Sequence, residues 1–185
     1  MSIVKTKRPA VGPAFSGGVS SWAKLAGEIR KLLNSSDLRV LTTMLDYYGL
    51  LADTPGMATR PDGSPHERVA HVERCLVDHF GDERFLPHLI LHELETGVLA
   101  AADQLAELYG DQRLAEKLRR GIELAGGPEL VNDGPATAPS KRLLSHLPGY
   151  VKTLDGPLAI GELGVAQLRG ACPHADAWFA RLLDR

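Results

Sequence analysis

The chain has 185 residues, of which 44% are hydrophobic and 24% are charged, and its formal net charge is −2. These values are typical of a globular protein with one buried core, and they argue against intrinsic disorder. They also argue against nucleic-acid binding by bulk electrostatics, because neutralising phosphates normally requires a strongly basic surface.

Residues 1–18 are rich in glycine, proline and basic side chains, and they predict loop or at most one short strand near residues 2–6. A helix is expected from Ser20 to Leu33, where apolar side chains recur every three or four residues. A strand from Arg39 to Leu45 should follow and end at Asp46. The next segment, from Gly49 to Pro65, is expected to be a long loop.

The following segment predicts a second helix, from about Pro65 to Phe80, and a second strand, from Phe85 to Leu91. A strand, a helix and a strand in this order imply a parallel pair with a right-handed crossover. Residues 97–126 should be helical with a break near Gly110, and further helices are expected over residues 140–147, 157–171 and 174–183. We therefore predict one α/β domain over residues 1–185, with a small, mostly parallel sheet within residues 19–96 and a mainly helical part over 97–185.

No apolar run approaches the roughly 20 residues that cross a bilayer, and the N-terminus lacks the apolar block of a secretory signal. We expect no membrane association and a cytoplasmic location. In that compartment Cys75 and Cys172 should be reduced rather than bridged, and their spacing is not that of metal ligands.

Acidic residues follow both predicted strands. Asp46 ends the first strand, and Asp53 follows seven residues later, so both could lie at the carboxyl end of a parallel sheet, where ligands collect. Either could equally begin a turn or cap a helix.

Glu93 and Glu95 follow the second strand. An extended backbone would place both side chains on one face, as two ligands of a hard cation require. If a helix begins at once, the side chains diverge and act as acids near a helix N-terminus.

A third polar group, Asn132, Asp133, Ser140 and Lys141, precedes and opens a predicted helix. Free backbone N–H groups there favour anions, and a lysine can stabilise the charge on a transferring phosphoryl group. The alternative is a serine cap beside a solvated lysine.

His71, Cys75 and His79 share one helical face and could bind a metal, although such residues more often border a buried stripe.

Four stretches resemble the bacterial family DUF4276: LTTMLDYYGLLADTPG, RFLPHLILHELE, VNDGPATAPSKRLLSHLPGYVKTLDGPL and ACPHADAWFARL. That family is similar to the TOPRIM-like domains of overcoming-lysogenization-defect (OLD) nucleases, which bind divalent metal through acidic residues and cut nucleic acid. The resemblance implies a TOPRIM-like fold, a Mg²⁺ or Mn²⁺ cofactor, a phage-defence role and an AAA-type ATPase partner.

The same resemblance implies roles for individual residues. Asp46 looks like the TOPRIM aspartate, Glu93 and Glu95 look like the second acidic cluster, and Lys141 looks like the catalytic lysine of OLD-type nucleases. The family pattern also includes a first strand of the type Glu-Gly-x-Thr/Ser-Glu, to which nothing in residues 1–18 corresponds. Either the start lies upstream, or the first strand and its catalysis are lost, in which case a dimer or partner should cover the exposed strand edge.

Three functions follow as hypotheses, of which the third is a different hydrolase or a small-molecule binding protein that uses the same carboxylates. The first is a metal-dependent TOPRIM-like nuclease in which Asp46, Glu93, Glu95 and Asp53 bind Mg²⁺ or Mn²⁺ and Lys141 stabilises the developing charge. The second is a catalytically inactive TOPRIM-like subunit that binds or regulates a partner.

Overall fold

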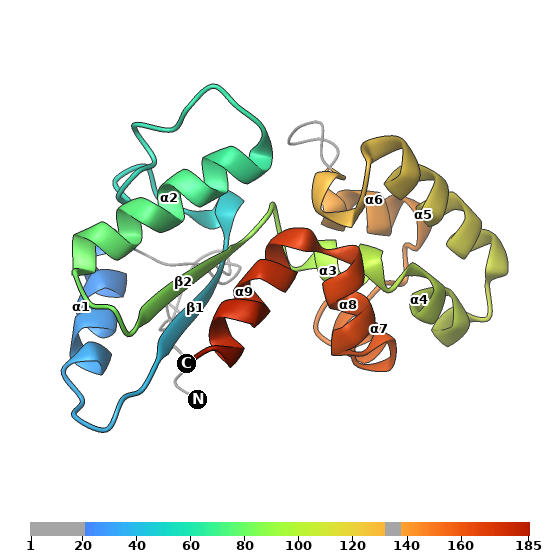
Figure 1. Cartoon of the computed structure of the whole chain (residues 1–185). Coiled ribbons are helices and arrows are strands. Elements are labelled where there is room, and N and C mark those ends of the chain that lie inside the picture. The colour runs from blue at the N-terminus through green and yellow to red at the C-terminus, as the bar shows by residue number, and fades with distance from the viewer. Residues whose placement is uncertain (1–20, 132–137) are drawn as a thin grey trace, which may run out of the picture.

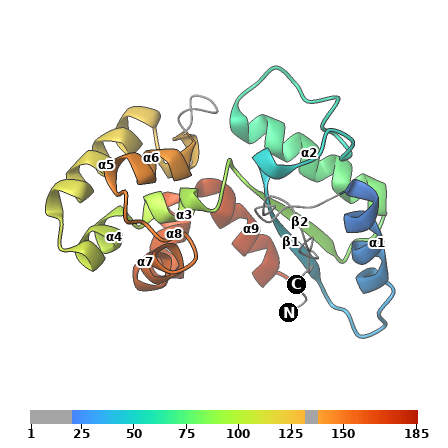
Figure 2. The same ribbon diagram turned by 180° about the vertical axis from the view of Figure 1, so that it is seen from behind.

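The computed structural model describes residues 21–131 and 138–185. The chain forms a lobe built on a two-stranded sheet and a lobe built of helices, which lie side by side in Figures 1 and 2. The last helix, α9, lies between them, against the sheet.

The sheet lobe contains α1 (Trp22–Leu33), β1 (Leu41–Asp46), the short 3₁₀ helix η1 (Tyr47–Gly49), α2 (Pro65–Phe80) and β2 (Phe85–Ile90). The strands are parallel and pair in register from Leu41 opposite Phe85 to Asp46 opposite Ile90. The predicted α/β class and the parallel pair are therefore confirmed. Such a pair occurs in many α/β folds and does not by itself identify a TOPRIM-like one.

Local sequence signals set the helix boundaries in this lobe. The hydroxyl of Ser64 accepts a hydrogen bond from the backbone N–H of Glu67, and the Glu67 carboxylate accepts one from the N–H of Ser64, so this reciprocal capping box begins α2. Gly81 ends the helix with φ +61°, a left-handed conformation that glycine adopts at little cost.

The two faces of the sheet have different neighbours because side chains alternate along a strand. Phe85 and Leu89 of β2 belong to a core shared with α1 and α2. His88 points to the opposite face, where it stacks on Trp178 of α9 (Pro173–Leu183) with ring centroids 4.5 Å apart. Trp178 Nε1 also donates a hydrogen bond of 2.9 Å to Thr42 Oγ1 of β1. The sheet therefore lies between α1 and α2 on one face and α9 on the other.

The helical lobe has its own hydrophobic core, formed mainly by leucine, alanine and valine side chains such as Leu105, Leu118 and Leu143. Its elements are α3 (Glu95–Ala100), α4 (Ala102–Tyr109), α5 (Gln112–Ala125), the 3₁₀ helix η2 (Pro128–Leu130), α6 (Pro139–His146), α7 (Asp155–Leu163) and α8 (Val165–Ala171).

Two details of this half differ from the sequence prediction. The helix expected over residues 97–126 is broken at Ala101 as well as at Gly110, and the helix expected over 157–171 is two helices. Gly164 separates the latter with φ +79° and ψ 158°, a conformation that cannot continue an α-helix. The strand considered near residues 2–6 lies outside the described residues. Across the described ranges, no helix is both long and apolar enough to cross a bilayer.

Candidate functional site

Asp46 lies at the carboxyl end of β1, opposite the last residue of β2. Its carboxylate accepts a hydrogen bond from the backbone N–H of Leu94, in the segment that joins β2 to α3. Because parallel strands end at the same edge, the acidic residues that follow β2 come close to the acid that ends β1.

Glu95 is the first residue of α3 and is almost completely buried, with 1% of its surface exposed. Its Oε1 lies 2.8 Å from Nζ of Lys152, whose side chain is 52% exposed and belongs to the loop between α6 and α7. Oε2 of Glu95 has no hydrogen-bond partner in residues 21–131 and 138–185. The site therefore contains a buried carboxylate whose second oxygen has no hydrogen-bond partner in this part of the chain.

Glu93 precedes α3 by two residues, and its Oε2 accepts a hydrogen bond of 3.2 Å from the backbone N–H of Ser140 in the first turn of α6. A carboxylate at this position is favoured by the unpaired N–H groups of the helix. The third polar segment predicted from the sequence thus contacts the acidic edge of the sheet, although Asn132 and Asp133 lie outside the described residues.

The helix begins at Glu95, so Glu93 and Glu95 do not continue an extended strand. Both carboxylates nevertheless affect the pKa of Asp46. Burial raises the pKa of Asp46, as do the negative charges of Glu95 and Glu93, whereas the positive charge of Lys152 lowers it.

The same carboxylates affect the pKa of Lys152. Burial lowers its pKa, but the contact with Glu95 and the charges of Glu93 and Asp46 outweigh burial, and the net pKa is raised. Three carboxylates and one ammonium group sum to a formal charge of −2 when all are ionised, which a single divalent cation would neutralise.

The remaining predicted site residues lie at different places. Asp53 is an exposed turn residue of the loop after η1, and none of the contacts that define the acidic cluster involves it. Lys141 follows Ser140 in the first turn of α6 and is exposed. Lys152 was not predicted. Its only sequence signal is a lysine in a loop between glycine residues, which many surface loops share.

The three carboxylates do not form a compact ligand set. Within the described part of the chain, the three potential ligands that lie within 4.8 Å of one another are Glu73, His88 and His174. The sequence also suggested His71, Cys75 and His79 as metal ligands. Nε2 of His71 lies 3.6 Å from Sγ of Cys75, whereas His79 contacts Arg30. Cys75 and Cys172 are free thiols, as expected.

The sequence model of the DUF4276 family, described as a domain of unknown function, matches residues 1–183, and the chain therefore belongs to this family. No curated protein and no solved structure matches the chain.

Proposed function

We propose that this protein is a metal-dependent, TOPRIM-like nuclease that hydrolyses phosphodiesters at the edge formed by Asp46, Glu93 and Glu95. The observation that carries the proposal is the electrostatic coupling of these carboxylates to one another and to Lys152 at the carboxyl end of the parallel strands. The TOPRIM-like assignment itself rests on the sequence resemblance.

The chemistry of the donors fits a hard divalent cation. Carboxylate oxygens are the ligands that Mg²⁺ and Mn²⁺ prefer, and Mg²⁺ commonly keeps several waters while using only one or two carboxylates. A loosely spaced cluster with a net charge of −2, in which Oε2 of Glu95 has no hydrogen-bond partner among the described residues, meets these requirements. When bound, the ion would supply a metal-activated water and stabilise charge on the phosphate.

Each side chain of the cluster would have its own role in the reaction. Asp46 and Glu93 would hold the ion, and Glu95 would orient a water molecule or accept its proton. Lys152 would hold the Glu95 carboxylate in place through their contact. Lys141 follows Ser140, whose backbone N–H donates a hydrogen bond to Glu93. Lys141 would contact a phosphate of the substrate and stabilise its developing charge.

The test combines metal binding and cleavage. Calorimetry with Mn²⁺ on the whole chain should detect a site that Asp46→Asn weakens, while Asp53→Asn leaves it unchanged. Cleavage of plasmid DNA and of RNA in Mn²⁺ should depend on Asp46 and Lys141. Equal Mn²⁺ affinity in the wild type and in Asp46→Asn would refute the site.

A second function is favoured by the ion pair between Lys152 and Glu95. The ammonium group already occupies the position of a counter-ion, so the cluster could be a structural remnant in a subunit that binds a partner, such as an AAA-type ATPase. Under this proposal the wild type neither binds Mn²⁺ at this edge nor cleaves nucleic acid, alone or with the ATPase.

A further inference from the structure

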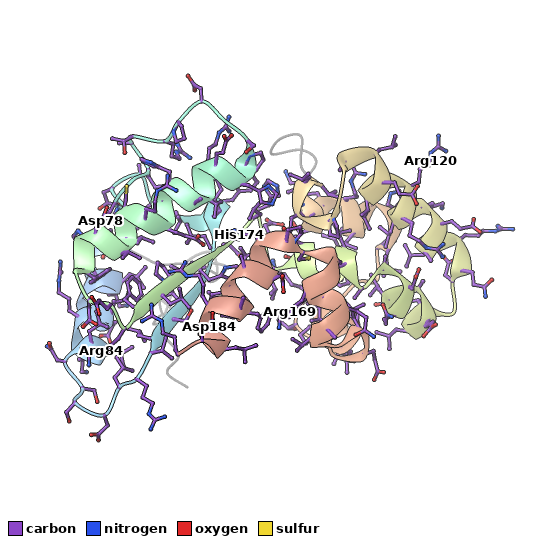
Figure 3. All side chains as sticks on the ribbon, viewed as in Figure 1. Asp78, Arg84, Arg120, Arg169, His174 and Asp184 are labelled. Atoms are coloured by element: carbon purple, nitrogen blue, oxygen red, sulfur yellow. The ribbon has the colours of Figure 1, made fainter. Side chains whose placement is uncertain are left out.

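A second group of potential ligands lies beside β2, where a side chain of α2 reaches the strand and meets two histidines of the face that α9 covers. Glu73 comes from α2, His88 from β2 and His174 from the first turn of α9. Figure 3 labels His174 where this helix begins, beside the sheet lobe. Oε1 of Glu73 lies 3.0 Å from Nε2 of His174 and 3.8 Å from Nδ1 of His88. Three separate elements therefore bring a carboxylate and two imidazoles together.

These distances are close to the spacing of ligands around one metal ion. Nitrogen and oxygen ligands lie about 2.0–2.2 Å from a tetrahedral zinc ion, which places the ligand atoms roughly 3.3–3.6 Å apart. The separations of 3.0 Å and 3.8 Å lie just below and just above that range, and the shorter one is also a hydrogen bond. The separation of 3.8 Å is too long for a hydrogen bond between Glu73 and His88, so direct hydrogen bonding does not explain why these two groups face each other.

Neighbouring groups fix the orientation of these side chains. Oε1 of Glu73 accepts a hydrogen bond of 2.8 Å from the backbone N–H of Leu89. The ring of His88 lies between those of Trp178 and His174, with centroids 4.5 Å and 5.0 Å away and interplanar angles of 12° and 23°. Such supporting contacts are typical of metal ligands, whose orientation is usually set by a further layer of residues.

A cavity of about 190 Å³ adjoins the group and includes both histidines in its lining. The rest of the lining is mostly apolar, with Trp178, Met44 and Cys172 among its residues. Water or a small ligand in this cavity could therefore complete the coordination of an ion held by three protein ligands, as in zinc sites that keep one position open.

We infer that Glu73, His88 and His174 form a binding site for a divalent transition metal of the zinc type, with an open coordination position toward the cavity. The two imidazoles favour Zn²⁺ or Co²⁺ over Mg²⁺. The inference is independent of the proposed nuclease site, which uses other residues and a harder cation.

The test uses the whole chain after removal of metal with EDTA. Calorimetry with Zn²⁺ should give one site per chain, and Co²⁺ should produce visible absorption bands of a low-symmetry complex. Glu73→Gln and His174→Gln should each weaken Zn²⁺ binding by about 100-fold or more, since loss of even a supporting residue costs 10–100-fold. The matched controls are His146→Gln, an exposed histidine of α6, and His71→Gln, which should both bind like the wild type.

A direct readout on the wild type avoids dependence on variants that fail to fold. The ring nitrogens of His88 and His174 should shift together in ¹H–¹⁵N spectra as Zn²⁺ is added, while those of His146 should not. The inference is overturned if the wild type binds neither Zn²⁺ nor Co²⁺, if His174→Gln binds with wild-type affinity, or if binding depends on His71 instead. Unchanged Zn²⁺ binding in Asp46→Asn should accompany a positive result and separates this site from the acidic edge.

Discussion

Nζ of Lys152 lies 2.8 Å from Oε1 of Glu95, and the contact joins a half-exposed loop lysine to a carboxylate that is 1% exposed. A carboxylate that is this deeply buried needs a compensating positive charge or hydrogen bonds to remain ionised. The pair therefore anchors the loop between α6 and α7 to the start of α3.

Replacing Lys152 with Met should destabilise the protein by about 1–3 kcal/mol, because it leaves Glu95 buried without its partner. Urea denaturation at pH 7 measures the change. Lys117→Met on the exposed side of α5 is the control and should change the stability by less than about 0.5 kcal/mol. An equally small effect in Lys152→Met would show that the pair contributes nothing to stability.

Asp46→Asn should become more stable relative to the wild type as the pH rises. The folded pKa of Asp46 is raised above its usual value of 3.8, mainly by burial and by the neighbouring carboxylates. The Asp46 carboxyl group therefore contributes stability below pH 3.8 that is lost as the pH rises through its folded pKa. The asparagine of the variant does not titrate, so the variant loses no stability in this way.

The expected gain at pH 7 is small, because water screens a half-buried carboxylate. Denaturation of both proteins in EDTA, at several pH values from about 3.5 to 7, measures it. A stability difference that stays constant over this range would contradict the raised pKa.

His88→Phe should make the protein less sensitive to acid. The pKa of His88 is lowered from 6.5 to about 3, mainly by burial, so the histidine contributes stability above pH 6.5 that is lost as the pH falls toward 3. Phenylalanine can keep the stacking on Trp178 but takes up no proton.

The midpoint temperature of thermal unfolding in EDTA should therefore fall less steeply between pH 7 and about pH 4 for His88→Phe than for the wild type. His146→Gln, which changes an exposed histidine, should follow the wild-type profile. Parallel profiles for His88→Phe and the wild type would exclude His88 as the acid-sensitive group.

Glu129→Ala should destabilise the protein by about 1–3 kcal/mol. The buried carboxylate of Glu129 accepts hydrogen bonds from the backbone N–H groups of His174 and Ala175, at 3.0 Å and 3.1 Å, and so joins η2 to the first turn of α9. Urea denaturation should show the loss, whereas Glu123→Ala, on an exposed position of α5, should be nearly neutral. Equal stabilities of these two variants would contradict the capping role.

Much of the fold follows from local signals. The apolar spacing of α1, the serine and glycine that bound α2, and the two apolar runs that become β1 and β2 are each contained within a short segment. Such signals act between near neighbours, so a single sequence reveals them. The position of acidic residues after both strands was visible for the same reason.

Only the tertiary structure decided which side chains share a site. Lys152 meets Glu95, and His88 meets Glu73 and His174, across long stretches of chain. None of these residues stands in a spacing that predicts its partner, because the contacts depend on how the loop before α7 and helix α9 pack against the sheet. The sequence by itself determined the helices, the parallel strands and the acidic strand ends, whereas long-range packing determined the lysine in the acidic cluster and the histidines on the opposite side of the sheet from α1.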